Sequence, residues 1–118
     1  MRRHHISVKH AWEGVLTGFK TQPNFRVHLA FSLIAVILGW YLEIDGTEWA
    51  LILFVIAVGL AIELINTSIE FTVDLLTQQY HLLAKYAKDT AAAAMLIYAV
   101  ISIFIAVIIF VPKIWPRF

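Results

Sequence analysis

Four polar side chains recur at helical spacing along a segment that is otherwise apolar over residues 49–71. They are Glu63, Asn66, Glu70 and Asp74, and we call them the polar stripe. At about 100° per residue, steps of three, four and four place them within roughly 80° of one another on one helix face. Ionisable groups at membrane depth cost about 2.5–3.5 kcal/mol each, so they usually face a protein interior or a polar cavity and mark function. The spacing therefore predicts a helix face that binds a cation.

The polar stripe carries oxygen ligands of the kind that hard cations prefer. Magnesium typically takes one or two protein carboxylates and completes its shell with water and phosphate oxygens. Lys88 and Asp89, expected just before another apolar helix, add a cation and a further acid. Carboxylates, a metal and a lysine are the parts of a phosphoryl-transfer site. Two structural alternatives stay open: a stripe that only fixes helix packing, and Lys88-Asp89 as solvated loop charges.

Several other functional classes lack their sequence signals. The chain has neither GxxxxGK[ST] nor GxGxxG, which excludes kinases built on soluble folds with such loops. Its five histidines show no HExxH or other zinc spacing, and it has no cysteine for disulfides or thiolate sites. The net charge of +1 provides no electrostatic basis for nucleic acid as a partner.

Composition places the chain among integral membrane proteins. Of its 118 residues, 61% are hydrophobic, and the mean hydropathy is +0.81, whereas soluble domains are about 45–50% apolar. We expect one all-α membrane domain over residues 1–118, with transmembrane helices at 27–42, 49–71 and 91–111. The first is short for the ~20 residues that a span needs, and extension toward Pro23 would lengthen it. Residues 1–22 predict an amphipathic surface helix, whose apolar side chains are Ile6, Trp12, Val15, Leu16 and Phe19.

Basic residues predict how the chain sits in the membrane. No cleavable signal peptide is visible, so insertion is expected to rely on the helices themselves. The acidic 43–48 turn has no lysine or arginine and is expected outside, while the N-terminus and the 74–89 connector are expected in the cytoplasm. Lys113 and Arg117 would then lie outside, against seven basic residues inside. Those seven are Arg2, Arg3, Lys9, Lys20, Arg26, Lys85 and Lys88.

Residues 63–97 resemble the signature of the small bacterial membrane lipid kinases, the prokaryotic diacylglycerol kinase and undecaprenol kinase family. The matching pattern is E-x-x-N-[ST]-x-[IL]-E-x-x-x-D over 63–74, then Tyr80-His81, and then Ala87-Lys88-Asp89. The similarity covers nearly the whole chain, including Gly14 and the stretch Asn24-Phe-Arg-Val-His28.

The resemblance implies a homotrimer in the bacterial cell membrane, with composite active sites at subunit interfaces near the cytoplasmic side. ATP with Mg²⁺ would phosphorylate a lipid hydroxyl there. By position, Glu63 would be the general base, Glu70 a magnesium ligand, and Asn66 a residue that positions lipid or metal. Lys88 would act on the phosphates with support from Asp89. The candidate nucleotide-binding residues are Arg3, Asp74, Tyr80, His81, Lys88 and Asp89.

One position departs from the family pattern. A glutamate usually stands just before the N-[FAI]-R-[IV]-H stretch as a second metal-binding carboxylate, and here Gln22 occupies that place. An amide oxygen can coordinate magnesium but contributes no charge. Weaker metal binding, altered nucleotide preference, low activity and an inert homologue are the alternatives that this change leaves open.

The sequence after Lys88-Asp89 bears on the choice of lipid. It continues Thr-Ala-Ala-Ala-Ala, which resembles the undecaprenol kinase type more than the diacylglycerol kinase type. The expected product is therefore undecaprenyl phosphate. The alternatives are a diacylglycerol kinase that makes phosphatidic acid and, from another class, a non-catalytic membrane oligomer or small transporter.

Overall fold

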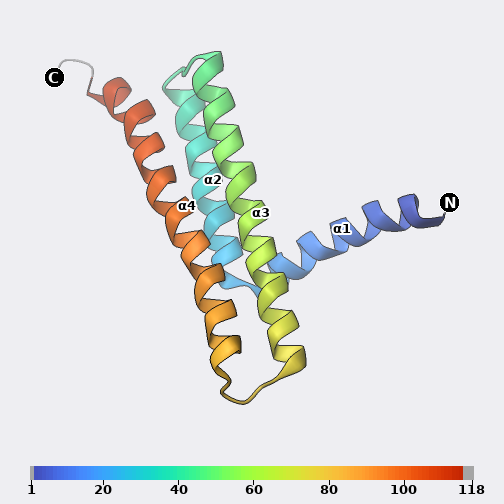
Figure 1. Ribbon diagram of the computed structural model, residues 1–118. Coiled ribbons are helices and arrows are strands. Elements are labelled where there is room, and N and C mark those ends of the chain that lie inside the picture. The colour runs from blue at the N-terminus through green and yellow to red at the C-terminus, as the bar shows by residue number, and fades with distance from the viewer. Residues whose placement is uncertain (1, 116–118) are drawn as a thin grey trace.

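The chain folds into four α-helices and the short turns between them (Figure 1). The computed structural model describes residues 2–115, with side chains from residue 7 onward. The helices are α1 (Arg2–Thr21), α2 (Pro23–Tyr41), α3 (Gly46–Leu76) and α4 (Leu82–Ile114). No strand occurs among residues 2–115, which confirms the all-α prediction.

Helices α2, α3 and α4 run side by side, and α1 projects away from them (Figure 1). The three bundled helices are each long and apolar enough to cross a membrane, as predicted. They extend beyond the predicted apolar stretches: α2 begins at Pro23, and α3 spans 31 residues, or about 46 Å. Because a hydrocarbon core is about 30 Å thick, α3 is long enough to carry polar residues of its last turns beyond it. Helix α3 contacts both α2 and α4.

The junction between α1 and α2 follows from Pro23. Proline disfavours helical backbone in the residue before it, and Gln22 is extended, with φ −115° and ψ 105°. Just before the junction, Gly18 lies against Leu64 of α3, where an added Cβ would come within 3.0 Å of the leucine side chain. This glycine therefore lets the end of α1 approach the bundle closely.

The turn between α2 and α3 is closed by two capping motifs. Glu43 has a left-handed φ of 53°, and the N–H of Ile44 donates to the Gly39 carbonyl oxygen at 3.1 Å, which ends α2. Asp45 begins α3 with a capping box: its carboxylate accepts the Glu48 N–H at 2.8 Å, and the Glu48 carboxylate accepts the Asp45 N–H at 3.1 Å.

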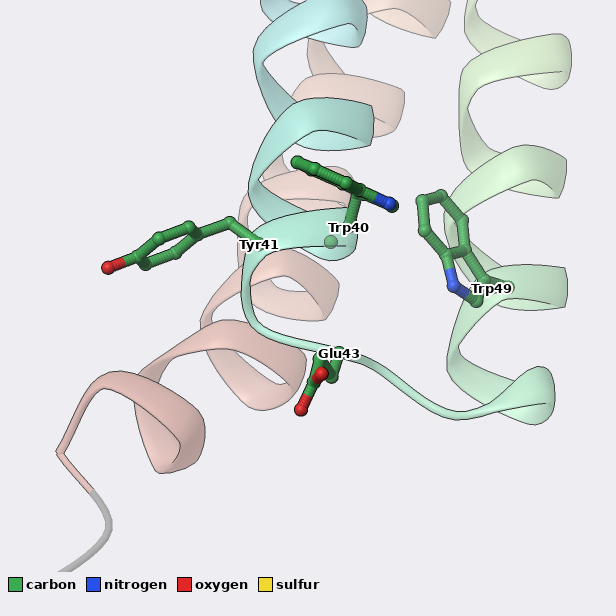
Figure 2. Close-up of a pocket in the computed structure, with 5 residues that line it drawn as sticks. Trp40, Tyr41, Glu43 and Trp49 are labelled. Carbon is green, nitrogen blue, oxygen red and sulfur yellow. The ribbon is translucent and has the colours of Figure 1, made fainter.

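The packed core lies at this same end of the bundle. Its buried side chains are Ile44, Ile52, Ile109 and Phe110. An ion pair of 3.1 Å between Lys113 and Glu48 joins the end of α4 to the start of α3. A cavity of about 400 Å³ opens on the turn, where the rings of Trp40 and Trp49 face each other from α2 and α3 (Figure 2).

Candidate active site

The buried face of α3 carries a carboxylate. Gly59, Glu63 and Thr67 follow at intervals of four residues and are all buried, with Glu63 only 5% exposed. The Thr67 hydroxyl donates to the Glu63 backbone carbonyl at 2.9 Å and not to its side chain. Among the described residues, the Glu63 carboxylate has no hydrogen-bond partner, and its oxygens, unlike Asn66 Oδ1, are not completely buried. A carboxylate in a largely buried residue whose oxygens can still be reached is able to take up a proton or bind a ligand.

Asn66 presents a second buried acceptor. Its Oδ1 atom is buried without a hydrogen-bond partner in the described part of the chain. An amide oxygen has two lone pairs and can accept a hydroxyl proton or coordinate a hard cation. The predicted polar stripe therefore holds two open oxygen groups, those of Glu63 and Asn66, three residues apart on α3.

Lys88 and Asp74 meet where α4 begins and α3 ends. The Lys88 Nζ donates to Asp74 Oδ1 at 2.7 Å, and both side chains are substantially exposed. Glu70, one turn before Asp74, acts electrostatically on Lys88 and also on Glu63. Four predicted site residues therefore interact electrostatically along the end of α3 and the start of α4. They are the buried Glu63, Glu70, and the exposed pair Asp74 and Lys88.

Asp89, Tyr80 and His81 form no hydrogen bond with those four residues in the described part of the chain. Asp89 pairs with Lys85 one turn earlier on α4. His81 is the N-cap of α4, and its Nδ1 accepts the Leu83 N–H at 3.1 Å. Tyr80 is 79% exposed in the loop between α3 and α4. Tyr80 and His81 thus lie just before α4, and Asp89 lies within it, directly after Lys88.

The two predicted metal residues are not brought into contact. Gln22 is half-buried and donates to the Thr21 hydroxyl at 3.3 Å, and no contact between Gln22 and Glu70 is found. Within the part of the chain that the structure describes, no three His, Asp or Glu side chains form a metal-binding group. The open oxygen of Asn66 and the carboxylate of Glu70 fit a magnesium ion that takes few protein ligands and fills its shell with phosphate oxygens. Arg3 lies outside the described side chains.

An apolar groove lies where α1 meets the bundle. It has a volume of about 390 Å³, and its α3 wall, Leu60 and Leu64, lies within about 100° of Glu63 around the helix. Such a groove accepts a hydrocarbon chain and would place a polar group at its end close to α3. Its lining residues are Trp12, Val15, Leu16 and Phe19 of α1, Phe25 and Leu29 of α2, and Leu60 and Leu64.

Sequence reasoning missed one polar contact beside the site. His28 of α2 and Tyr98 of α4 stack with ring centroids 5.5 Å apart, against α3 at Gly59. The two residues are 70 positions apart, so no spacing within a single helix indicated the pair. His28 was noted only as part of the stretch that resembles the lipid kinases.

The sequence was compared with known proteins. It matches the prokaryotic diacylglycerol kinase family over residues 9–110. It is 42% identical to an undecaprenol kinase of Bacillus subtilis (strain 168) over 113 residues, which cover 96% of this chain and 92% of that protein. It is 34% identical to a diacylglycerol kinase of Synechocystis over 108 residues, 91% of this chain and 62% of the relative. The diacylglycerol kinase of Escherichia coli (strain K12) is 29% identical over 109 residues, 92% and 86% of the two chains.

Proposed function

The chain belongs to the prokaryotic diacylglycerol kinase family, which makes it a membrane lipid kinase with ATP as co-substrate, and we propose that its lipid is undecaprenol. The support for this lipid is the relative that shares 42% identity over nearly both full lengths and is named an undecaprenol kinase. The diacylglycerol kinases share 34% and 29% and support diacylglycerol less well.

The observation that carries the catalytic proposal is the buried, unpartnered carboxylate of Glu63 near an apolar groove. The lipid chain would lie in the groove, and its terminal hydroxyl would reach the buried face of α3. Glu63 accepts the hydroxyl proton while the lipid oxygen attacks the γ-phosphorus of ATP. The new P–O bond forms as the bond between the γ-phosphorus and the bridging oxygen breaks, and ADP leaves with that electron pair. Asn66 would position the lipid or the metal: its Nδ2 can donate to the lipid oxygen, and its open Oδ1 can coordinate a hard cation.

The charged groups at the end of α3 and α4 would hold the nucleotide. Lys88 neutralises phosphate charge, and Asp74 positions its ammonium group through the 2.7 Å contact. Asp89, Tyr80, His81 and Arg3 are proposed for the nucleotide side because of their place in the family pattern. Glu70 and Gln22 would hold Mg²⁺, which supplies further charge neutralisation when bound.

The proposal includes assembly and orientation. Large apolar side chains are exposed along all three bundle helices, and one chain offers few ligands for the metal. We therefore propose a homotrimer whose neighbouring chains complete each site. The distribution of basic residues favours a cytoplasmic N-terminus and active site, with the C-terminus outside.

A side-by-side assay tests the choice of lipid. The purified protein is incubated with ATP and Mg²⁺ in mixed micelles that contain either undecaprenol or diacylglycerol at equal mole fraction. We expect a higher kcat/KM with undecaprenol and formation of undecaprenyl phosphate. A preference for diacylglycerol would replace the proposed substrate with the alternative one. Turnover of neither lipid would favour the non-catalytic reading of the polar stripe.

A further inference from the structure

A chain of hydrogen bonds links all three bundle helices one turn away from Glu63. The Tyr98 hydroxyl of α4 donates to the Val55 carbonyl oxygen of α3 at 2.8 Å. The same Tyr98 oxygen lies 3.3 Å from Nε2 of His28 on α2. Both side chains are half-buried, and their rings stack with an interplanar angle of 20°.

The direction of these bonds follows from counting protons. A phenol has one O–H donor, and Val55 offers only a carbonyl acceptor, so the Tyr98 proton is committed to Val55. The Tyr98 oxygen is therefore the acceptor toward His28, and the histidine must carry its proton on Nε2. The hydrogen bonds therefore run in one direction: His28 donates to Tyr98, and Tyr98 donates to the Val55 carbonyl oxygen.

Because Gly59 has no side chain, the rings of His28 and Tyr98 lie directly against the α3 backbone. An added Cβ at Gly59 would lie within 3.0 Å of both the His28 ring and the Tyr98 ring. Gly59 and Glu63 are four residues apart and occupy the same buried face of α3. If the two rings pack differently against Gly59, α3 shifts or rotates along its axis. Glu63, on the same face of α3, then changes its position relative to α2 and α4.

We propose that His28 and Tyr98 are positioning residues for Glu63, which hold α3 at the height where its carboxylate meets the lipid hydroxyl. Glu63 has no hydrogen-bond partner of its own among the described residues, so its position is set by how its helix is held. This inference rests on the proposed role of Glu63 as base. Neither His28 nor Tyr98 touches the reacting atoms in it.

The first test removes the hydrogen bonds and keeps the ring. Tyr98→Phe preserves the aromatic face against Gly59, whereas the phenol no longer bonds to His28 or Val55. We expect kcat for lipid phosphorylation to fall about 10-fold or more, because small misplacements of a catalytic group are costly, while KM for ATP stays unchanged. Tyr41→Phe is the matched control, since Tyr41 is 76% exposed at the opposite end of α2. Wild-type kcat in Tyr98→Phe would overturn the proposal.

The second test uses conservative replacement at His28. His28→Gln keeps an N–H donor that can reach Tyr98, and His28→Leu does not. We expect Gln to retain most of the kcat and Leu to lose it to the same degree as Tyr98→Phe, with rates measured on equal amounts of folded, monodisperse protein. Equal losses in both variants would overturn the proposal, because they would make packing alone responsible.

A spectroscopic test separates this inference from the proposed function. Nitrogen NMR of ¹⁵N-histidine protein, with His28 assigned from the His28→Gln difference, should show a neutral ring protonated at Nε2, and the Nε2 signal should shift in Tyr98→Phe. A ring protonated only at Nδ1 would overturn the hydrogen-bond chain itself. This measurement needs no turnover, whereas an inactive wild-type protein would overturn the proposed function instead.

Discussion

Lys88 at the start of α4 donates to Asp74 near the end of α3 at 2.7 Å, and this contact joins the two helices across the loop between them. Both side chains are about half exposed, so solvent screens the pair and it contributes little to stability. The pair matters more because Asp74 holds the positive charge of Lys88 at a fixed place between α3 and α4. Glu70, one turn earlier on α3, acts on the same ammonium group.

Variants of Asp74 and Lys88 can distinguish a structural role of the ion pair, which joins α3 to α4, from a catalytic role of the Lys88 charge. Lys88→Ala should lower kcat at least 100-fold, as expected for loss of a charged phosphate contact, and Asp74→Asn should mainly raise KM for ATP. The double exchange Asp74→Lys with Lys88→Asp restores the ion pair but moves the cation to α3. We expect it to stay inactive in a steady-state kinase assay. Recovery of activity in the exchanged protein would make the pair a helix clamp only.

Gln22 should respond to restoration of the family's usual carboxylate. Gln22→Glu adds a negative charge at the junction of α1 and α2, and the added charge should lower the Mg²⁺ concentration required for half-maximal activity. The measurement is a magnesium titration of the wild type and the variant at saturating ATP. Thr47→Glu, at an exposed position in the first turn of α3, is the control and should leave the titration unchanged. If the two variants behave alike, Gln22 is not the metal-side position.

Gly59→Ala should destabilise the bundle because the new methyl group would collide with the rings of His28 and Tyr98. Overpacking of this kind costs about 1–3 kcal/mol. Gly14→Ala on α1 is the matched control, since nothing lies within 4 Å of the added Cβ. That control should be neutral or stabilising by up to about 1 kcal/mol, because alanine favours helix. Unfolding in detergent measures both, and equal stability of the two variants would contradict the close approach at Gly59.

Asp45 should give the fold an acid-sensitive contribution at the turn between α2 and α3. The pKa of Asp45 is lowered, mainly because its carboxylate accepts the backbone N–H of Glu48, with a further contribution from the charge of Lys113. A lowered folded-state pKa means that this stabilisation is present above the ordinary value of 3.8 and is lost as the pH falls through the folded value. Asp45→Asn keeps a cap that cannot titrate.

The check is the melting temperature of the wild type and Asp45→Asn, measured from neutral pH down to below 3.8. The two curves should converge at the acid end, because the wild type loses its ionised cap and the variant has none to lose. Parallel curves over the whole range would mean that the Asp45 charge does not contribute to stability.

Much of the fold could be predicted from sequence features that lie within a single helix or at its end. The steps between Glu63, Asn66, Glu70 and Asp74 predicted one helix face, and the structure buries Glu63 on it. The break after α1 likewise follows from a local rule, since Pro23 constrains the backbone of the residue before it. These features depend on local periodicity and backbone chemistry, which the sequence records directly.

Contacts between different helices could not be predicted from local periodicity. The sequence grouped Lys88 with Asp89, whereas the structure pairs Lys88 with Asp74 and Asp89 with Lys85. The contact of His28 with Tyr98 depends on how α2 and α4 both pack on α3, and no spacing within one helix encodes it. The relation of Gln22 to Glu70 stays a prediction, because one chain does not bring them together.

The central claim is that Glu63 accepts the proton of the lipid hydroxyl. Its most direct test is transfer of ³²P from ATP to undecaprenol in mixed micelles by wild-type protein and Glu63→Gln, with Glu43→Gln in the turn between α2 and α3 as the matched control, because Glu43 is exposed. We predict that Glu63→Gln lowers kcat by about 10²–10⁴-fold, the usual effect of losing a general base, while the Glu43 variant and the nucleotide affinity of both proteins stay at wild-type values. Wild-type kcat in Glu63→Gln would contradict the account.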